Sequence, residues 1–262
     1  MPGQIRAFRR LLLLIPHLLA GLLLALLLAL PGRRRPQAGI RAAAIRGWFA
    51  GLLRIMAVEV RAYGAAHAAP CLRVANHVSW LDIPVLGSLG ADAFVAKSEV
   101  ARWPLFGPMA RLTRTIFLER GAFRTRAATE SMKAAMLRGG SVLFFPEGTT
   151  GDGRRLLRFH PRLFAAAIEA QAPVQPVALS YDCEDYDAVP FINDDAFATH
   201  LWRLLQQPAV RVNVRYAPAF AVAGSLRKPA CAEARRMIAA RLEALERVPD
   251  CWIDGAFAAE SA

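Results

Sequence analysis

The sequence predicts an α/β fold with a mixed sheet flanked by helices, preceded by an N-terminal membrane-anchoring helical segment. Three observations lead to this prediction. An almost unbroken apolar run covers residues 11–30, and an amphipathic stretch follows over residues 40–57. From Val58 onward, short β-rich segments alternate with helical stretches, a pattern typical of a sheet that carries helices on its faces.

The apolar run over residues 11–30 would form a helix about 30 Å long, which matches the thickness of a bilayer core. Pro16, His17 and Gly21 interrupt its apolar character. Basic residues lie on both flanks, at Arg6, Arg9, Arg10, Arg33, Arg34 and Arg35. The run is long for the core of a signal peptide, so we interpret it as an anchor. The cations on both sides leave its orientation open.

The second helical pattern, over residues 40–57, has an apolar stripe. The stripe consists of Ile45, Trp48, Phe49, Leu52 and Met56. With the first helix it predicts a hairpin that enters one leaflet and returns, and arginines at the edges of the stripe suit lipid headgroups. A single membrane span is the close alternative, and two ordinary core helices are the third.

The remaining chain predicts seven strands and six helices in alternation. We expect strands at residues 58–62, 72–75, 93–96, 115–118, 141–145, 174–179 and 210–216. We expect helices at residues 80–87, 104–112, 124–137, 161–170, 196–205 and 230–247. Gly139-Gly140 is a suitable helix stop before the fifth strand. Residues 31–38 resemble a linker, and the tail after Asp250 carries little signal.

The charge balance indicates an anionic partner. The 262-residue chain carries 33 Lys and Arg against 21 Asp and Glu, a net charge of +12, and is 55% hydrophobic. Anionic membranes, acidic carrier proteins and nucleic acids all fit such a charge, and a compositional bias toward Arg is an alternative explanation. The arginines are scattered and lack interleaved aromatic residues, so we expect no nucleic-acid partner.

The four cysteines do not form a metal-binding pattern. Cys71, Cys183, Cys231 and Cys251 include no C-x-x-C pair and no Cys/His spacing typical of zinc. We therefore expect reduced thiols, no metal and a domain that faces the cytosol.

Two motifs carry the chemistry. The string Asn76-His77-Val78-Ser79-Trp80-Leu81-Asp82 follows an expected strand and offers a histidine base with a carboxylate that can orient it. The string Phe145-Pro146-Glu147-Gly148-Thr149 forms a tight acidic-glycine turn after another apolar strand. A positioned general base can activate a hydroxyl group, which contributes roughly 10²–10⁴-fold to a rate. Five residues do not span a regular helical contact, so the chain must turn between His77 and Asp82.

Three further segments accompany these motifs, two between them in the sequence and one after them. They are Phe94-Val95-Ala96-Lys97-Ser98-Glu99, Phe117-Leu118-Glu119-Arg120-Gly121 and Val174-Gln175-Pro176-Val177-Ala178-Leu179. With them the chain resembles, over roughly residues 58–220, the glycerolipid acyltransferase family, which comprises the 1-acylglycerol-3-phosphate acyltransferases and their relatives. The resemblance implies a role in phospholipid biosynthesis. Together with the apolar N-terminus and the change of pattern at Val58, it predicts three parts: a membrane anchor at 1–57, an acyltransferase domain at 58–250 and a tail at 251–262.

The resemblance further implies roles for single residues. His77 would deprotonate the acceptor hydroxyl and Asp82 would orient His77, so that the hydroxyl attacks acyl-CoA or acyl carrier protein directly. Arg120 would bind the acceptor's phosphate, for which a guanidinium group is well shaped. Substrate-binding residues would be Asn76, Arg120, Glu147, Gly148 and Thr149. A surface arginine is the alternative for Arg120, and a carboxylate that binds turn amides is the alternative for Glu147.

The acceptor is less well defined than the reaction. Phosphatidate-forming members usually continue the third block with Arg, whereas Thr150 stands here, with Arg154, Arg155 and Arg158 farther along the loop. The first expectation is lysophosphatidate converted to phosphatidate, and lyso-ornithine lipid or another lysolipid is the alternative. A thioesterase and a catalytically inactive lipid-binding protein are further alternatives. We expect no cofactor beyond the acyl thioester, membrane lipids as partners, and a catalytic domain on the cytoplasmic side of a bacterial inner membrane.

Overall fold

The computed structural model describes residues 2–29, 38–90, 93–103, 106–118, 122–192 and 195–246. Its strands are β1 (Val58–Tyr63), β2 (Leu72–Ala75), β3 (Ala93–Lys97), β4 (Ile116–Leu118), β5 (Val142–Phe144), β6 (Val174–Cys183) and β7 (Val210–Tyr216). Its α-helices are α1 (Pro2–Ala29), α2 (Ala38–Ile55), α3 (Asp82–Ser88), α4 (Phe106–Leu112), α5 (Ala122–Leu137), α6 (Ala165–Ala170), α7 (Phe197–Gln206) and α8 (Arg227–Glu246). Short 3₁₀ helices are η1 (Ser98–Arg102), η2 (Arg162–Phe164) and η3 (Tyr186–Ala188).

The described strands form one mixed sheet in the order β1-β7-β6-β2-β5-β3-β4. The pairs from β6 to β4 are parallel, β1 is parallel to β7, and only β6 with β7 is antiparallel among these strands. The carboxyl ends of β2, β5, β3 and β4 therefore meet at one edge of the sheet, where α/β proteins commonly place ligands. This topology brings the segments after these four strands to the same side of the molecule.

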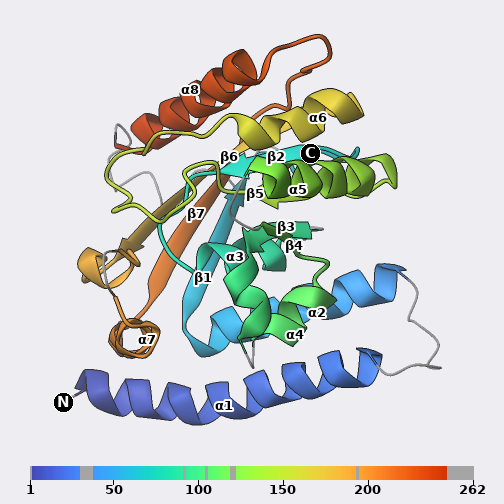
Figure 1. Ribbon diagram of the computed structural model, residues 1–262. Helices are drawn as coiled ribbons and strands as arrows, with labels where there is room; N and C mark the ends of the chain where they lie inside the picture. The colour runs from blue at the N-terminus through green and yellow to red at the C-terminus, as the bar shows by residue number, and fades with distance from the viewer. Residues whose placement is uncertain are drawn as a thin grey trace, which may run out of the picture.

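Two helical layers cover the sheet, and α1 adds a third on one side (Figure 1). Helices α5, α6 and α8 pack on one face, over a core that includes Leu72, Val74, Phe144 and Phe164. Helices α2, α3 and α7 lie on the other side, whose core includes Leu143, Val177 and Leu179. Each strand alternates its side chains between the faces. Both faces are covered by helices, as expected for a largely parallel sheet.

Helices α1 and α2 pack closely against each other. The His17 ring stacks on the Trp48 ring with centroids 5.2 Å apart, and His17 Nε2 lies 3.0 Å from the Trp48 carbonyl oxygen. At Gly21 an added Cβ would overlap the Trp48 ring, so this glycine permits the close approach. Two of the residues that interrupt the apolar run, His17 and Gly21, therefore form the contact between the two helices.

The apolar stripe of α2 faces the protein. Phe49, Leu52 and Met56 are buried, and α2 packs against α3 and β1. The stripe is confirmed, but it packs on the apolar surface of α3 and β1 and is not left exposed to lipid. Residues on both sides of position 57 share one hydrophobic core. Anchoring by residues 1–57 therefore stays a prediction about function.

Helix α1 is fastened to α7 by two arginines. Arg10 is buried and donates to the carbonyl oxygens of Leu205 (3.0 Å), Gln207 (2.6 Å) and Pro208 (2.8 Å), while Arg6 donates to Gln206. These carbonyls lie at the C-terminus of α7, where no intrahelical donor remains and a cation is favourable. The opposite face of α1 is apolar and exposed at Ile5, Phe8, Leu12, Leu13, Ile15, Leu19, Leu23, Leu24 and Leu26.

The expected strands and helices are all present within the described residues. The helix expected at 80–87 begins only at Asp82, because the chain first makes a turn around that carboxylate. The helix expected at 161–170 is divided into η2 and α6, and the strand expected at 174–179 continues to Cys183 along β7. The linker at 31–38 falls, except for Ala38, outside the described residues, as does the tail at 251–262.

Candidate active site

Asn76 fixes the end of β2 against β6. Its side-chain amide donates to the carbonyl oxygen of Leu179 at 2.9 Å and accepts from the amide of Leu179 at 2.8 Å. Asn76 is only 2% exposed, and both polar atoms of its side chain are occupied. This geometry does not favour the expected role of Asn76 in substrate binding, because the buried amide already has partners. Asn76 positions the segment that carries His77.

His77 and Asp82 form a hydrogen-bonded pair. His77 Nδ1 lies 2.7 Å from Asp82 Oδ2, and the histidine side chain is 17% exposed while that of the aspartate is 0% exposed. The Nδ1 contact with a carboxylate fixes the proton on that nitrogen and leaves Nε2 with its lone pair. Nε2 has no hydrogen-bonding partner among the described residues, so it can accept a proton from a bound molecule.

The turn between the two residues wraps around the carboxylate. Asp82 Oδ2 also accepts the amides of Val78 at 2.8 Å and Ser79 at 3.1 Å, which confirms the expected turn. The other oxygen, Oδ1, accepts the hydroxyl of Tyr181 at 2.5 Å. The carboxylate is thus buried with both of its oxygens directed at donors, as a buried anion requires.

The segment after β5 closes over His77. The ring of Phe145 stacks on the imidazole with centroids 3.9 Å apart, and the Gly151 amide donates to the His77 carbonyl oxygen at 2.8 Å. Gly148 has φ of +71°, a left-handed conformation that glycine adopts without strain, and its amide donates to the carbonyl oxygen of Phe145. Gly148 and the neighbouring Thr149 are exposed, so both can reach a bound molecule.

Glu147 lies beneath this turn. It is 5% exposed, and its Oε1 accepts the amide of His77 at 3.3 Å. Burial raises the pKa of Glu147 from its ordinary value of 4.5 to about 7, although hydrogen bonds from the amides of His77 and Leu157 lower it. The geometry favours the alternative in which this carboxylate binds turn amides. Glu147 stabilises the backbone of the site through the amides of His77 and Leu157.

The residues expected to bind a phosphate differ in their placement. Arg120 lies outside the described residues, but β4 ends two residues earlier, at the same sheet edge as His77. Thr150 donates its hydroxyl to the carbonyl oxygen of Phe191. Arg154 pairs with Asp187 at 2.7 Å and lies over the Tyr186 ring. Thr150 and Arg154 are thus both engaged within the protein.

Sequence reasoning missed two buried groups around the site. One is Tyr181, two residues beyond the last block that resembles the family. The other is His200, which accepts the indole N–H of Trp80 at 3.0 Å on Nδ1 and faces the carbonyls of Val189 and Pro190 through Nε2. His200 is fully buried. No local sequence pattern indicates the contacts of Tyr181 or His200, because their partners Asp82 and Trp80 are about a hundred residues away in sequence.

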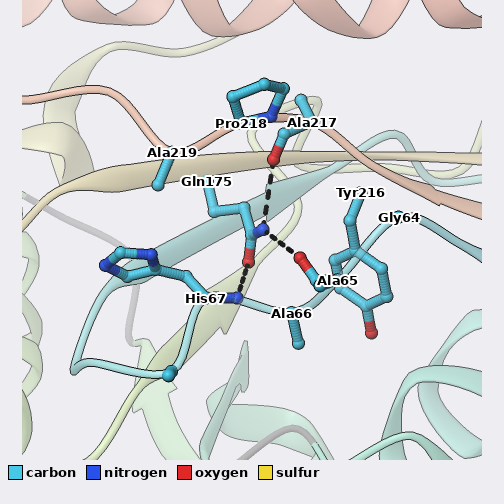
Figure 2. A pocket seen from close by; sticks show the side chains of 10 residues that line it. Gly64, Ala65, Ala66, His67, Gln175, Tyr216, Ala217, Pro218 and Ala219 are labelled. Atoms are coloured by element: carbon cyan, nitrogen blue, oxygen red, sulfur yellow. Dashed lines mark hydrogen bonds between the residues drawn. The ribbon is translucent and has the colours of Figure 1, made fainter.

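A cavity of about 370 Å³ lies elsewhere, at the edge of the sheet where β2 and β6 begin (Figure 2). Its main polar side chain is Gln175, which donates to the carbonyls of Ala65 and Ala217 and accepts the amide of His67. These bonds join the loops after β1 and β7, so the amide of Gln175 is already engaged on both of its polar atoms. His77 follows the opposite end of β2, and this cavity is therefore separate from the His77 pair.

The described residues contain no group of three or more His, Cys, Asp or Glu side chains that could hold a metal ion. The described cysteines, Cys71, Cys183 and Cys231, form no disulfide with one another. The principal chemical feature of the site is a base with an orienting carboxylate, exposed on one side at the carboxyl edge of a sheet. Such a pair can remove a proton from a hydroxyl group that binds there.

Comparisons with known proteins agree with this chemistry. The family model described as Acyltransferase matches residues 57–180. A lyso-ornithine lipid O-acyltransferase of Pseudomonas aeruginosa is 45% identical over 65% of this chain and 67% of that protein. The protein of that name from Brucella abortus is 37% identical over 67% of this chain and 72% of its own length.

A second group of relatives has a different printed name. A 1-acyl-sn-glycerol-3-phosphate acyltransferase of Neisseria gonorrhoeae is 36% identical over 61% of this chain and 64% of that protein. The crystal structure of the 1-acyl-sn-glycerophosphate acyltransferase PlsC from Thermotoga maritima superposes with a TM-score of 0.64 at 21% identity, covering 93% of this chain and 99% of that one. That likeness confirms the fold. With its His77-Asp82 pair and these relatives, the chain belongs to the acyltransferase family that includes the 1-acylglycerol-3-phosphate and lyso-ornithine lipid acyltransferases.

Proposed function

We propose that this acyltransferase moves an acyl chain from acyl-CoA or acyl carrier protein to the hydroxyl of a lysolipid, with His77 as the general base. The observation that carries the proposal is the contact between His77 Nδ1 and Asp82 Oδ2, which leaves Nε2 open. Nε2 takes the hydroxyl proton while the oxygen attacks the thioester carbonyl. The carbon–sulfur bond then breaks, and the leaving thiolate takes the proton back from His77. The charge of Asp82 stabilises the imidazolium formed between these steps.

We propose lyso-ornithine lipid as the preferred acceptor. Its head carries a carboxylate and an ammonium group and no phosphate, so it does not need the arginine that Thr150 replaces. The Thr150 hydroxyl is bonded to Phe191, and Arg154 is paired with Asp187, so both side chains already have partners other than a phosphate. The relatives with 45% and 37% identity bear the lyso-ornithine lipid name. These observations favour a zwitterionic headgroup over a phosphomonoester.

Lysophosphatidate is the second candidate. β4 ends at Leu118, two residues before Arg120 in the sequence, at the same sheet edge as His77, and β4 is the third strand from β2, roughly 14 Å away at ordinary strand spacing. A headgroup phosphate could bind there while the hydroxyl reaches His77. The relative from Neisseria gonorrhoeae, whose name specifies 1-acylglycerol-3-phosphate, supports this acceptor.

The enzyme associates with membranes through α1 in this proposal. Among the described helices, α1 alone is long and apolar enough to cross a bilayer, over Pro2–Leu26. It packs lengthwise on the domain through Arg10 and exposes apolar side chains along its outer face. That combination supports a helix that lies in one leaflet more than one that crosses the bilayer. The catalytic domain faces the cytoplasm, where thioester donors are found, and protease accessibility in oriented vesicles tests this side.

The full-length protein, in detergent or vesicles, can be incubated with a panel of lysolipids and an isotope-labelled acyl-CoA or acyl carrier protein, followed by lipid mass spectrometry. We expect labelled ornithine lipid as the main product and none with His77→Ala. Labelled phosphatidate as the main product would support the second candidate. Release of free fatty acid without lipid product would indicate a thioesterase, and no turnover of any donor would indicate a lipid-binding protein.

A further inference from the structure

Tyr181 completes the hydrogen bonding of Asp82 from a strand that carries none of the expected catalytic residues. Its hydroxyl lies 2.5 Å from Asp82 Oδ1. The other donors, His77 Nδ1 and the amides of Val78 and Ser79, all contact Oδ2. Among the described residues, Tyr181 is thus the sole donor to Oδ1.

The register of the sheet places Tyr181 at this point. The Asn76 side chain is bonded to the main chain of Leu179, so β6 is held at a fixed register beside the end of β2. Side chains two residues apart in a strand lie on the same face. Leu179 and Tyr181 therefore point to the same side of the sheet, and Tyr181 reaches the carboxylate at the start of α3.

The site around Asp82 is buried, so water cannot replace the Tyr181 hydroxyl as the donor to Oδ1. Asp82 is 0% exposed and Tyr181 is 7% exposed, so bulk water does not reach the carboxylate. Burial, followed by the nearby Asp82 carboxylate, raises the pKa of Tyr181 well above its ordinary value of 10.0. The phenol therefore remains protonated and continues to donate. A buried carboxylate oxygen without a donor would be costly, and the group would rotate to share its remaining donors.

We propose that Tyr181 is a positioning residue for acyl transfer, which holds the Asp82 carboxylate in the orientation that aligns His77. The inference rests on the proposed function of the His77-Asp82 pair. Tyr181 does not touch the substrate in this arrangement and acts only through Asp82. Its removal should slow the chemical step and leave substrate binding unchanged, because neither the acceptor nor the donor contacts the phenol.

The test compares Tyr181→Phe with the full-length enzyme in steady-state kinetics. We expect kcat to fall about 10- to 100-fold, the range for loss of a hydrogen bond to a charged group, with KM for donor and acceptor nearly unchanged. Tyr186→Phe is the matched control, because its hydroxyl donates to the carbonyl oxygen of Asp152 and not to Asp82. A fall of the same size in both variants would overturn the proposal, as would an unchanged kcat in Tyr181→Phe.

A double-mutant cycle shows whether Tyr181 acts through Asp82. In an Asp82→Asn background, Tyr181→Phe should change kcat less than about 3-fold, because the charge that the phenol positions is already absent. Independent, multiplicative losses would overturn the proposal. His77→Ala distinguishes a failure of the proposed function from a failure of the proposed role of Tyr181. Full activity in His77→Ala refutes the proposed function, whereas an inactive His77→Ala with a fully active Tyr181→Phe refutes only the role of Tyr181.

Discussion

Replacement of Glu147 by glutamine should make the stability of the protein less sensitive to a rise in pH from about 5 to about 8. The buried carboxyl has a pKa of about 7 in the folded protein, against an ordinary value of 4.5. The folded state therefore holds this proton more tightly than the unfolded state does. Between pH 4.5 and 7 the folded state binds more protons at this site, so the free energy of unfolding falls as pH rises and levels off above pH 7.

The size of the effect follows from the difference between these two pKa values. One pH unit corresponds to about 1.4 kcal/mol, so full ionisation of Glu147 costs up to about 3 kcal/mol of stability. Most of that cost, about 2.5 kcal/mol, develops between about pH 5 and about pH 8. The amide side chain introduced by Glu147→Gln keeps an oxygen that can accept the amides of His77 and Leu157, and it has no charge to bury. The difference in free energy of unfolding between Glu147→Gln and the natural protein should therefore grow by about 2.5 kcal/mol between about pH 5 and about pH 8, in favour of the variant.

Thermal unfolding followed by tryptophan fluorescence, in one detergent at about pH 5 and about pH 8, measures this advantage. For a chain of this size, about 2.5 kcal/mol corresponds to a difference in Tm of roughly 5–10 °C. Glu169→Gln is the control, because Glu169 is an exposed residue that pairs with Lys133 and should show no such growth with pH. An equal difference in Tm between Glu147→Gln and the natural protein at both pH values would refute the reasoning.

Three further predictions concern the pair, the docking of α1 and the acceptor. Asp82→Asn should lower kcat less than His77→Ala, which loses the whole base contribution of roughly 10²–10⁴-fold, and equal turnover of both variants would contradict this. Arg10→Ala should destabilise the protein by about 2–3 kcal/mol, because the carbonyls at the end of α7 lose a charged donor. Arg10→Ala should also be cleaved faster by protease between α1 and the rest of the protein. An unchanged Tm in Arg10→Ala would contradict the predicted destabilisation. Arg120→Lys should raise acceptor KM more than donor KM with lysophosphatidate, since Lys lacks the bidentate fork, and an equal effect on lyso-ornithine lipid would show that Arg120 does not bind phosphate.

Local patterns in the sequence predicted the sheet and the contact between His77 and Asp82. The strands are short segments that are either largely apolar or, as in β1 and β7, alternate apolar with polar residues, and such segments are recognisable without tertiary information. The segments after β2, β4 and β5 meet at one carboxyl edge because the structure pairs β2, β5, β3 and β4 in parallel. His77 and Asp82 are five residues apart, so one turn brings them together, and sequence reasoning could anticipate that contact.

The supporting contacts depended on tertiary structure. Tyr181 reaches Asp82 across 99 residues, and Arg10 reaches Leu205 across 195 residues. Hydrogen bonds of this kind depend on the register of neighbouring strands and on the docking of helices, which no periodicity within a segment records. For the same reason the family resemblance implied that Asn76 binds substrate, whereas in the structure its side-chain amide is bonded to the main chain of Leu179 in β6. The sequence by itself determined which elements form and which base they carry, and only the packing of distant segments decided how that base is held.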